Sequence, residues 1–470
     1  MTLPSPGSTI HLIGIGGTGM SAIARVLLGQ GYTVTGSDRN PGALVPGLID
    51  AGARVHIGHD AAHVVGADAV IVTSAAAADH VEVAAARDAG IPVYKRADIL
   101  GDLTRGKRVI AIAGTAGKTT TTAMIAHILI TIGHDPSYII GGTLPISGVN
   151  GHAGTGDLFV IEADEYDNMF LGLTPYIAVI TNIVYDHPDF FPTEADMVAS
   201  FQAFVARIVP GGVLITCGDD PGARAIGGSF WGRGADKMLY YGTKADFPVI
   251  VVNHPQRNVL IMYAPYAPWW TMFMTVKFAL AVPGFHNLLN AAAAITAVLS
   301  ALGHGRDLDG ITDALASFTG ADRRFQVMGE RGGVIVVDDY AHHPLKIRAA
   351  LQAARSRYPD HAIWAVWQPH TYSRTQALWD DIARCFIDAD HVLVTPIYAA
   401  REAAIPGIDG ESITHMIAAN HADARYIETF EATTSLLRRE AASPAVILIM
   451  SAGDAPQIGR MFLDAANGTA

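Results

Sequence analysis

The chain has 470 residues, a formal net charge of −12 at pH 7 and two cysteines. This length accommodates about three domains of ~150 residues, and an acidic balance without a run of basic residues argues against nucleic acid or an anionic membrane surface as a partner. Because Cys217 and Cys385 lack the spacing of a zinc site or a disulfide framework, and no segment resembles a signal peptide or an apolar span of about 20 residues, we expect a cytoplasmic protein without membrane insertion.

The first region, residues 1–105, has short apolar strands that alternate with alanine-rich helical stretches. This alternation predicts a doubly wound parallel sheet, and therefore an α/β fold. The expected strands are 10–13, 33–35, 54–56, 69–72 and 92–94.

A glycine loop follows the first of these strands. Gly14-Ile15-Gly16-Gly17-Thr18-Gly19 has the G-x-G-x-x-G spacing and precedes a helix that is expected from Met20. N–H groups at such a helix start bind a pyrophosphate, and Asp38, after the next strand, can accept hydrogen bonds from a ribose. NAD and a UDP-sugar both contain a pyrophosphate, so both ligands remain open, as does a tight turn without a ligand.

The second region, 106–320, opens with an apolar strand and the loop Gly114-Thr115-Ala116-Gly117-Lys118-Thr119-Thr120. Glycines let backbone N–H groups face an anion, Lys118 can neutralise phosphate charge, and the Thr119 hydroxyl can bind Mg²⁺. Ile112 stands where a standard Walker loop has its first glycine. The order of strand, loop and helix nevertheless predicts an ATP site rather than a junction with a surface lysine.

Two acidic clusters follow later strands of the second region. Glu162-Ala163-Asp164-Glu165 comes after the expected strand 158–161, and Asp186-His187-Pro188-Asp189 after the strand 177–181. In an open α/β sheet both clusters lie at the edge that carries the phosphate loop. Carboxylates and an imidazole there can hold Mg²⁺ between phosphates and a substrate oxygen, with helix capping as the alternative.

A helix at 287–302 closes the second region, and Asn287 and Asn290 lie one turn apart on it. Two amides on one helix face suit recognition of a base or a phosphate, although Asn287 could equally be an N-cap. The preceding segment 227–270 is rich in Trp, Tyr and Pro and is expected to be antiparallel or loop.

The third region, 321–470, again alternates strands and helices, with strands expected at 334–337, 362–367, 391–395 and 445–450. Polar segments follow the first two of these strands, so their His, Tyr and Arg side chains should face one cleft, unless they form only a polar loop. The region has no H-E-x-x-H motif or cysteine cluster that would indicate zinc, and no G-x-S-x-G motif that would indicate a serine nucleophile.

Together these motifs resemble the Mur ligase family over nearly the whole chain, and most closely the members that join L-alanine to UDP-N-acetylmuramate. The motifs that carry the resemblance are Gly14–Met20, Gly114–Thr122, Glu162–Glu165, Thr181-Asn182 with Asp186-His187, His286-Asn287 with Asn290, Arg323–Phe325, Asp338–Pro344 and Gln368–Thr375. Their shared order along the chain is more specific than any single motif.

The resemblance implies three domains, with the UDP-sugar bound by 1–105, ATP by 106–320 and the amino acid by 321–470. It implies an amide-forming ligase of peptidoglycan biosynthesis, with UDP-N-acetylmuramate and L-alanine as substrates and an acyl phosphate as the activated intermediate. ATP and Mg²⁺ or Mn²⁺ are the implied cofactors, and a monomer or weak homodimer is the implied assembly.

By their positions in the motifs, residues are assigned to tasks that the resemblance implies. The catalytic residues are Lys118, Glu162, His187 and Arg324, and the metal ligands are Thr119, Glu162 and His187. The ATP-binding residues are Gly114, Thr115, Ala116, Gly117, Lys118, Thr119, Thr120, Asn287, Asn290, Arg324 and Asp339. The residues for the UDP-sugar are Gly14, Gly16, Gly17, Thr18, Gly19, Met20, Ser37, Asp38, Thr73 and Ser74. The residues for the amino acid are His342, His370 and Arg374.

Three positions depart from the family pattern. Ala116 stands where His is usual, Leu345-Lys346 where Thr-Glu is usual, and His80-Val81 where Asn-Pro is usual. The alternatives are a ligase that recycles an intact tripeptide, a non-catalytic nucleotide sensor and an NAD-dependent oxidoreductase. The segment 368–375 favours L-alanine over the tripeptide, the retained metal and transfer residues disfavour the sensor, and Lys118 disfavours the oxidoreductase.

Overall fold

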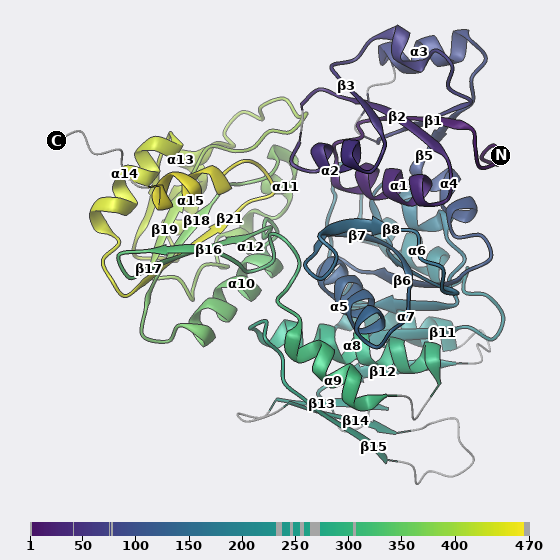
Figure 1. Cartoon of the computed structure of the whole chain (residues 1–470). Coiled ribbons are helices and arrows are strands. Elements are labelled where there is room, and N and C mark those ends of the chain that lie inside the picture. Colours follow the sequence, from purple (N-terminus) through teal and green to yellow (C-terminus); the bar gives the residue numbers. More distant parts are fainter. Residues whose placement is uncertain are drawn as a thin grey trace. The chain divides into compact units, whose positions relative to one another are not determined.

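The computed structural model describes residues 2–40, 42–74, 76, 79–231, 237–244, 248–253, 258–263, 273–303 and 307–464. Its strands form three sheets (Figure 1). The chain divides into two compact units. The first unit carries two of the sheets and comprises Met1–Val184, Ala195–Ala279 and Leu289–Phe318. The second unit carries the third sheet and comprises Tyr185–Glu194, Leu280–Leu288 and Thr319–Ala470.

The first sheet has five parallel strands in the order β3-β2-β1-β4-β5. Its strands are β1 (Thr9–Ile13), β2 (Thr33–Asp38), β3 (Arg54–Ile57), β4 (Ala69–Val72) and β5 (Val93–Lys95). Its helices are α1 (Thr18–Gly29), α2 (Val45–Asp50), η1 (Ala61–Val64), α3 (Val81–Asp88) and α4 (Arg96–Leu103). The doubly wound sheet expected from the sequence is confirmed. The strand order reverses at β1, so the glycine loop after β1 lies where open α/β sheets bind ligands.

The second sheet has ten strands in the order β15-β14-β13-β12-β11-β10-β6-β9-β7-β8. Its strands are β6 (Arg108–Ala113), β7 (Ser137–Leu144), β8 (Val149–His152), β9 (Leu158–Glu162), β10 (Ile177–Ile180), β11 (Val213–Cys217), β12 (Met238–Gly242), β13 (Val249–Val252), β14 (Asn258–Tyr263) and β15 (Phe273–Phe278). The helices in this part of the chain are α5 (Lys118–Thr131), η2 (Tyr166–Gly172), α6 (Glu194–Val205), α7 (Pro221–Trp231), α8 (Phe285–Leu302) and α9 (Leu308–Ser317). Strands β6, β9 and β10 are parallel neighbours, so their carboxyl ends bring the phosphate loop and Glu162 to one edge.

The segment 227–270 is only partly as expected. Strand β14 pairs antiparallel with β13 and β15, in agreement with the prediction. Strand β12 instead pairs parallel with both β11 and β13, so the expectation of antiparallel or loop structure is wrong for β12. The apolar runs of β12 and β13 are short, and pairing with a long parallel sheet rather than local sequence pattern fixes their direction. Residues 232–236, 245–247, 254–257 and 264–270 lie outside the described residues.

Helix α1 of the first sheet packs against the hairpin β7–β8 of the second sheet. The buried Asn150 side chain on β8 donates from Nδ2 to Thr18 O and to Ser21 Oγ, both at 2.9 Å. Gly151 leaves so little room that a Cβ there would collide with the Ala22 backbone. A close backbone approach and a buried amide therefore hold these two sheets together within the first unit.

The third sheet has the order β16-β17-β21-β18-β19-β20, with β16 antiparallel to β17 and the other neighbours parallel. Its strands are β16 (Gln326–Arg331), β17 (Val334–Asp339), β18 (Ala362–Trp367), β19 (His391–Val394), β20 (Ala424–Tyr426) and β21 (Ala445–Met450). Its helices are α10 (Pro344–Arg357), α11 (Tyr372–Ala377), α12 (Trp379–Ile382), α13 (Gly410–Ala418), α14 (Phe430–Glu440) and α15 (Pro456–Leu463). Every residue of the central strand β21 is buried, because helices cover both faces of the sheet.

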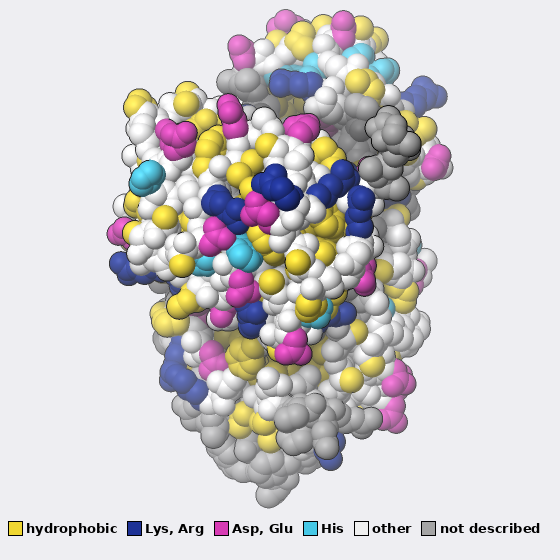
Figure 2. All heavy atoms as spheres, turned by 90° about the vertical axis from the view of Figure 1, so that its left-hand side faces the viewer, with side chains coloured by type: hydrophobic (Ala, Val, Ile, Leu, Met, Phe, Trp, Pro, Cys, Tyr) yellow, Lys and Arg dark blue, Asp and Glu magenta, His cyan; other side chains and the backbone are white. Residues whose placement is uncertain are grey.

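Among the described residues, α8 is the one helix that is long and apolar enough to cross a bilayer by length and composition, and most of it is buried within the protein. Basic and acidic side chains are intermixed on the described part of the face in Figure 2. Intermixed charges of this kind produce a weaker field than a patch of one sign.

Candidate functional site

The glycine loop of the first sheet connects β1 to α1. Backbone N–H groups fix it to the next strand: Gly14 N donates to Ser37 O at 2.8 Å, and Gly16 N donates to Asp38 Oδ2 at 2.9 Å. Thr73 N donates to Ile13 O at 3.3 Å, which places Thr73 beside the loop. Residues from three strand ends, all predicted for the UDP-sugar, therefore meet at one edge.

Other residues predicted for the UDP-sugar have different surroundings. Gly17 is the N-cap of α1 and Thr18 its first residue, so Gly17, Thr18 and Gly19 present a helix start that no capping side chain covers. The Met20 side chain is buried in the core, with 3% of its surface exposed. Ser37 Oγ donates to Glu82 Oε2 at 2.5 Å, and Ser74 Oγ donates to Asp167 Oδ2 at 2.9 Å.

The phosphate loop lies between β6 and α5, which begins at Lys118, so the predicted order of strand, loop and helix is confirmed. Gly117 has a φ of +85°, and a Cβ there would lie 2.6 Å from Asn290 Oδ1. Asn290 on α8 therefore touches the loop from a position 173 residues later in the chain. Ala116 contributes its backbone N–H, which donates to Asn182 Oδ1 at 2.8 Å, and this contact does not depend on the side chain at position 116.

Two carboxylates from the Glu162–Glu165 cluster contact the start of α5. Lys118 Nζ donates to Glu165 Oε2 and to Gly114 O, both at 2.6 Å. Thr119 Oγ1 donates to Glu162 Oε1 at 3.1 Å, and Glu162 Oε2 accepts from Gly141 N at 2.8 Å. Burial opposes the charge on Lys118, but Glu165 and its acidic neighbours outweigh it and raise the pKa of the ammonium. A charged lysine is what a phosphate ligand requires.

A second polar cluster lies in the second unit and is organised by Asp186. Arg374 Nε donates to Asp186 Oδ1 at 2.8 Å, Arg374 Nη2 lies 3.3 Å from His187 Nδ1, and Lys346 Nζ lies 3.9 Å from Asp186 Oδ2. Burial opposes ionisation of Asp186, yet Arg374, His187 and Lys346 hold its pKa well below the ordinary range. His187 has a φ of +58°, a conformation that costs about 1–3 kcal/mol in a residue other than glycine and is common at functional sites.

The three residues predicted for the amino acid lie together. Arg374 Nη1 is 2.9 Å from His370 Nδ1, and the His370 and His342 ring centroids are 5.6 Å apart. His342 Nδ1 lies 2.8 Å from Tyr340 O, so it donates to this carbonyl. Burial, with Arg374 as the next contribution, lowers the pKa of His370 to about 4, which leaves this imidazole neutral at pH 7.

Arg324 and Asp339 are also near each other in the second unit. The Arg324 guanidinium lies 5.1 Å from the centroid of the Tyr340 ring, and Asp339 Oδ2 accepts from Phe325 N at 2.8 Å. Burial raises the pKa of Asp339 to about 6, and Arg324 opposes this rise. Asn287 donates from Nδ2 to Pro283 O at 2.6 Å, so its amide also stabilises the loop that precedes α8.

Sequence reasoning missed the roles of three residues in these clusters. Glu165 forms an ion pair with Lys118, and Asp186 forms one with Arg374. Lys346 lies in a close charge contact with Asp186. Glu165 and Asp186 belong to the two acidic clusters that the sequence shows. Lys346 stands at one of the positions that depart from the family pattern. Which carboxylate of a segment meets which cation depends on the fold, so the sequence carried only a regional signal.

The free energy of unfolding should fall as the pH drops from about 6.5 to about 4. Burial lowers the pKa of His286, His343 and His370 from 6.5 to about 4. In this window the unfolded chain binds protons that the folded chain does not, at a cost of up to about 1.4 kcal/mol per pH unit for each histidine. The Asp339 carboxyl offsets the contribution of one of the three histidines, because its pKa in the folded chain is about 6 and the folded chain therefore binds a proton there below that pH.

Thermal unfolding at pH 7 and at about pH 5 measures this effect. His343 is the N-cap of α10 and accepts from Leu345 N, a task that Asn also performs. His343→Asn should therefore keep the helix start and reduce the loss of stability in acid. An equal or higher melting temperature at the lower pH would contradict the prediction.

Three family models match the chain in succession. The Mur ligase family catalytic domain matches residues 9–108, the Mur ligase middle domain 112–298 and the Mur ligase glutamate ligase domain 323–453. A UDP-N-acetylmuramate–L-alanine ligase of Desulfosudis oleivorans is 42% identical over 455 residues, which are 97% of this chain and 97% of that protein.

Solved structures show the same similarity. A UDP-N-acetylmuramate-alanine ligase from Thermotoga maritima superposes with a TM-score of 0.78 and 28% identity, and covers 97% of this chain and 98% of its own. A murein peptide ligase from Psychrobacter arcticus has a TM-score of 0.74 and 25% identity, over 99% of this chain and 100% of its own. The similarity therefore includes all three sheets.

Proposed function

The chain belongs to the Mur ligase family, and from this membership we propose that it joins L-alanine to the carboxylate of UDP-N-acetylmuramate at the expense of ATP, a step of peptidoglycan synthesis. Full-length relatives with this activity in their names support the choice of substrates. The main structural support for this chemistry lies at the phosphate loop. Lys118 contacts the carboxylate of Glu165, just after β9, and Thr119 contacts that of Glu162, at the end of β9.

A free carboxylate reacts poorly with an amine, so the γ-phosphoryl group of ATP has to convert it into an acyl phosphate. Lys118 would neutralise charge on the transferred group, and Arg324 would add a second positive charge. Asn290, against the loop, and Asp339 would position the nucleotide. The amine of L-alanine then attacks the acyl phosphate, so water must be excluded while the intermediate exists.

The Thr119 hydroxyl and the Glu162 carboxylate offer the oxygen donors that Mg²⁺ prefers, and they already lie 3.1 Å apart. The donor set therefore fits Mg²⁺ or Mn²⁺, with His187 as the third proposed ligand. When bound, the ion would reduce the negative charge of the phosphates. Thr119 and Glu162 belong to the first unit and His187 to the second.

L-Alanine would be held by His342, His370 and Arg374. A guanidinium binds a carboxylate through two parallel hydrogen bonds, and neutral imidazoles can accept from or donate to the amino group. We assign the UDP-sugar to 1–105, ATP to 106–320 and the amino acid to 321–470. We also propose a cytoplasmic location, with a monomer or weak homodimer as the assembly.

ADP release tests the proposed function. The protein should release ADP over many turnovers with UDP-N-acetylmuramate and L-alanine together, and not with either substrate alone, because the acyl phosphate that forms on the first has to be consumed by the second. Glycine, L-serine and the recycling tripeptide serve as alternative amine donors in matched assays. Faster turnover with the tripeptide would favour the recycling ligase, and reduction of NAD without ATP would overturn the assignment.

A further inference from the structure

A buried carboxylate surrounded by histidines lies at the carboxyl edge of the first sheet. Glu82, near the start of α3, is fully buried. Five histidines from β1, β3, η1 and the adjoining loops lie around it, either against the carboxylate or against one another: His11, His56, His59, His63 and His80. None of the tasks proposed for the ligase reaction uses these six side chains.

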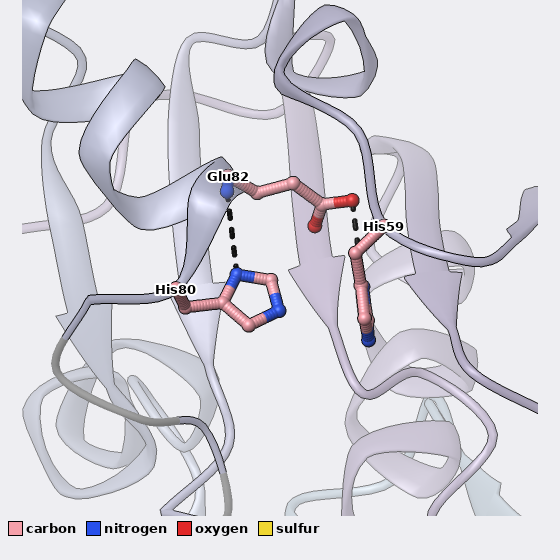
Figure 3. A group of neighbouring side chains, drawn as sticks. All are labelled: His59, His80 and Glu82. Carbon is pink, nitrogen blue, oxygen red and sulfur yellow. Dashed lines mark hydrogen bonds and ion pairs between the residues drawn. The ribbon is translucent and has the colours of Figure 1, made fainter.

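Three of them converge in the way that metal ligands do. One donor atom each from His59, His80 and Glu82 lies within 4.8 Å of the other two (Figure 3). His59 Nδ1 is 3.5 Å from Glu82 Oε1, and the two imidazole centroids are 4.4 Å apart. Distances of this size can contract around an ion, because metal–nitrogen and metal–oxygen bonds of about 2 Å place ligand atoms roughly 3–4 Å apart.

His80 supplies an independent indication of a ligand. Its Nδ1 accepts from Glu82 N at 3.3 Å and caps α3. Its Nε2 is buried, yet it has no hydrogen-bond partner among the residues that the structure describes. In Figure 3 this nitrogen points toward His59. A buried ring nitrogen without a partner is costly, which favours a bound ligand at this position.

The Glu82 carboxylate is already oriented as ligating carboxylates are. Ser37 Oγ and His11 Nε2 contact Oε2 at 2.5 and 3.3 Å, while Asp60 N and His63 Nδ1 contact Oε1 at 3.2 and 2.9 Å. Burial opposes its ionisation, but the hydrogen bonds from His11, Ser37 and His63 hold the pKa of Glu82 well below the ordinary value. An ionised carboxylate with hydrogen-bonded neighbours is the usual surrounding of a metal ligand.

We propose that His59, His80 and Glu82 bind a first-row transition-metal ion such as Zn²⁺. Two imidazoles and one carboxylate are a recurrent zinc donor set that leaves a fourth position for water. Imidazole nitrogens favour Zn²⁺ over Mg²⁺, so this site differs in its metal from the one proposed at Thr119 and Glu162. His59 and His80 are partly exposed, which gives the ion a route from solvent.

Binding through His80 Nε2 requires a change of tautomer. The contact from Glu82 N leaves the proton of the neutral ring on Nε2, whereas coordination needs it on Nδ1. The ion therefore displaces one proton from Nε2, Nδ1 takes up a proton, and the 3.3 Å contact to Glu82 N is given up. Burial and the neighbouring His59 lower the pKa of His80, which keeps the ring neutral and available.

Titration of the metal-free full-length protein with Co²⁺, without nucleotide, tests the site. Co²⁺ in a four-coordinate site with nitrogen ligands gives intense visible bands, and Zn²⁺ should displace it. His80→Asn keeps an N-cap acceptor for α3 and removes the ligand nitrogen, so it should weaken binding by at least about tenfold. His59→Asn should have the same effect and serves if the first variant is unstable.

Two control variants make the outcome specific. His152→Asn removes a histidine that is paired with a carboxylate, Asp135, at 2.8 Å outside the cluster, and it should bind Co²⁺ as the original chain does. Glu162→Gln removes a carboxylate of the proposed Mg²⁺ site and should leave the bands unchanged. The proposal is overturned if the original chain gives no bands, if both cluster variants bind as tightly as the original, or if only Glu162→Gln removes the signal.

Discussion

Lys118→Ala is expected to lower kcat by about 10²–10³-fold, because the variant lacks the charged donor that we propose faces the phosphates. The ammonium is held 2.6 Å from Glu165 and 2.6 Å from the Gly114 carbonyl, so it is preorganised at the loop rather than recruited by the nucleotide. Binding of UDP-N-acetylmuramate should change little, since we assign the sugar nucleotide to 1–105. Steady-state ADP release and calorimetric binding measure the two effects separately.

Lys277→Ala is the matched control for this variant. Lys277 is an exposed lysine on β15, and its loss should leave kcat unchanged. A Lys118→Ala protein that is folded and still turns over at the original rate would remove the lysine from the mechanism. Equal losses of turnover and of sugar-nucleotide binding would instead show that the two proposed sites are not independent.

Arg374→Lys is expected to raise the KM for L-alanine by about 10–100-fold with little change in the KM for ATP. Lysine keeps the charge but loses the planar fork that can hold a carboxylate through two bonds. Nε is engaged by Asp186 at 2.8 Å, so the Nη groups, near His370 and His187, are those that would meet the substrate. Kinetics with each substrate varied in turn, together with the melting temperature, measure the effect.

The same chemical change at another arginine–aspartate pair provides the control. Arg355 on α10 contacts Asp390, just before β19, at 2.8 Å in the same unit, and Arg355→Lys should leave the KM for L-alanine unchanged. A lower melting temperature of Arg374→Lys with an unchanged KM for L-alanine would mean that Arg374 only stabilises Asp186. The amino acid would then be held by other residues.

Many of the parallel strands in the three sheets could be predicted because their apolar runs are continuous and end at glycines or polar segments. Strands 69–72, 362–367 and 445–450 coincide with β4, β18 and β21. The hairpin β7–β8 was missed, since two adjacent glycines interrupt β7 and its partner α1 comes from more than 100 residues earlier. Strands β16 and β20 have mostly exposed or half-buried residues, and so they carry no apolar pattern.

The sequence predicts where the candidate site lies, but it does not predict which side chains of the site contact one another. Strand ends in a parallel sheet share an edge, so sequence order alone placed the phosphate loop beside Glu162. The pair between Asp186 and Arg374 joins residues 188 positions apart, and no local pattern specifies such a contact. The same holds for Glu82, whose partners on β1, β2 and η1 meet only in the folded sheet.

Recombination between relatives is constrained by the contact of α1 with the hairpin β7–β8. A chimera that takes only residues 1–105 from another ligase would place a foreign α1 against Asn150 and Gly151. The buried Asn150 amide would lose one of its two acceptors, Ser21 Oγ, wherever the new helix lacks a matching serine, and any inward shift of the helix backbone at position 22 would press on Gly151. The segments that have to come from the same parent are therefore discontinuous in the gene. Chimeras that exchange 137–152 together with 1–105 should fold more often than chimeras with a single crossover between the first two sheets.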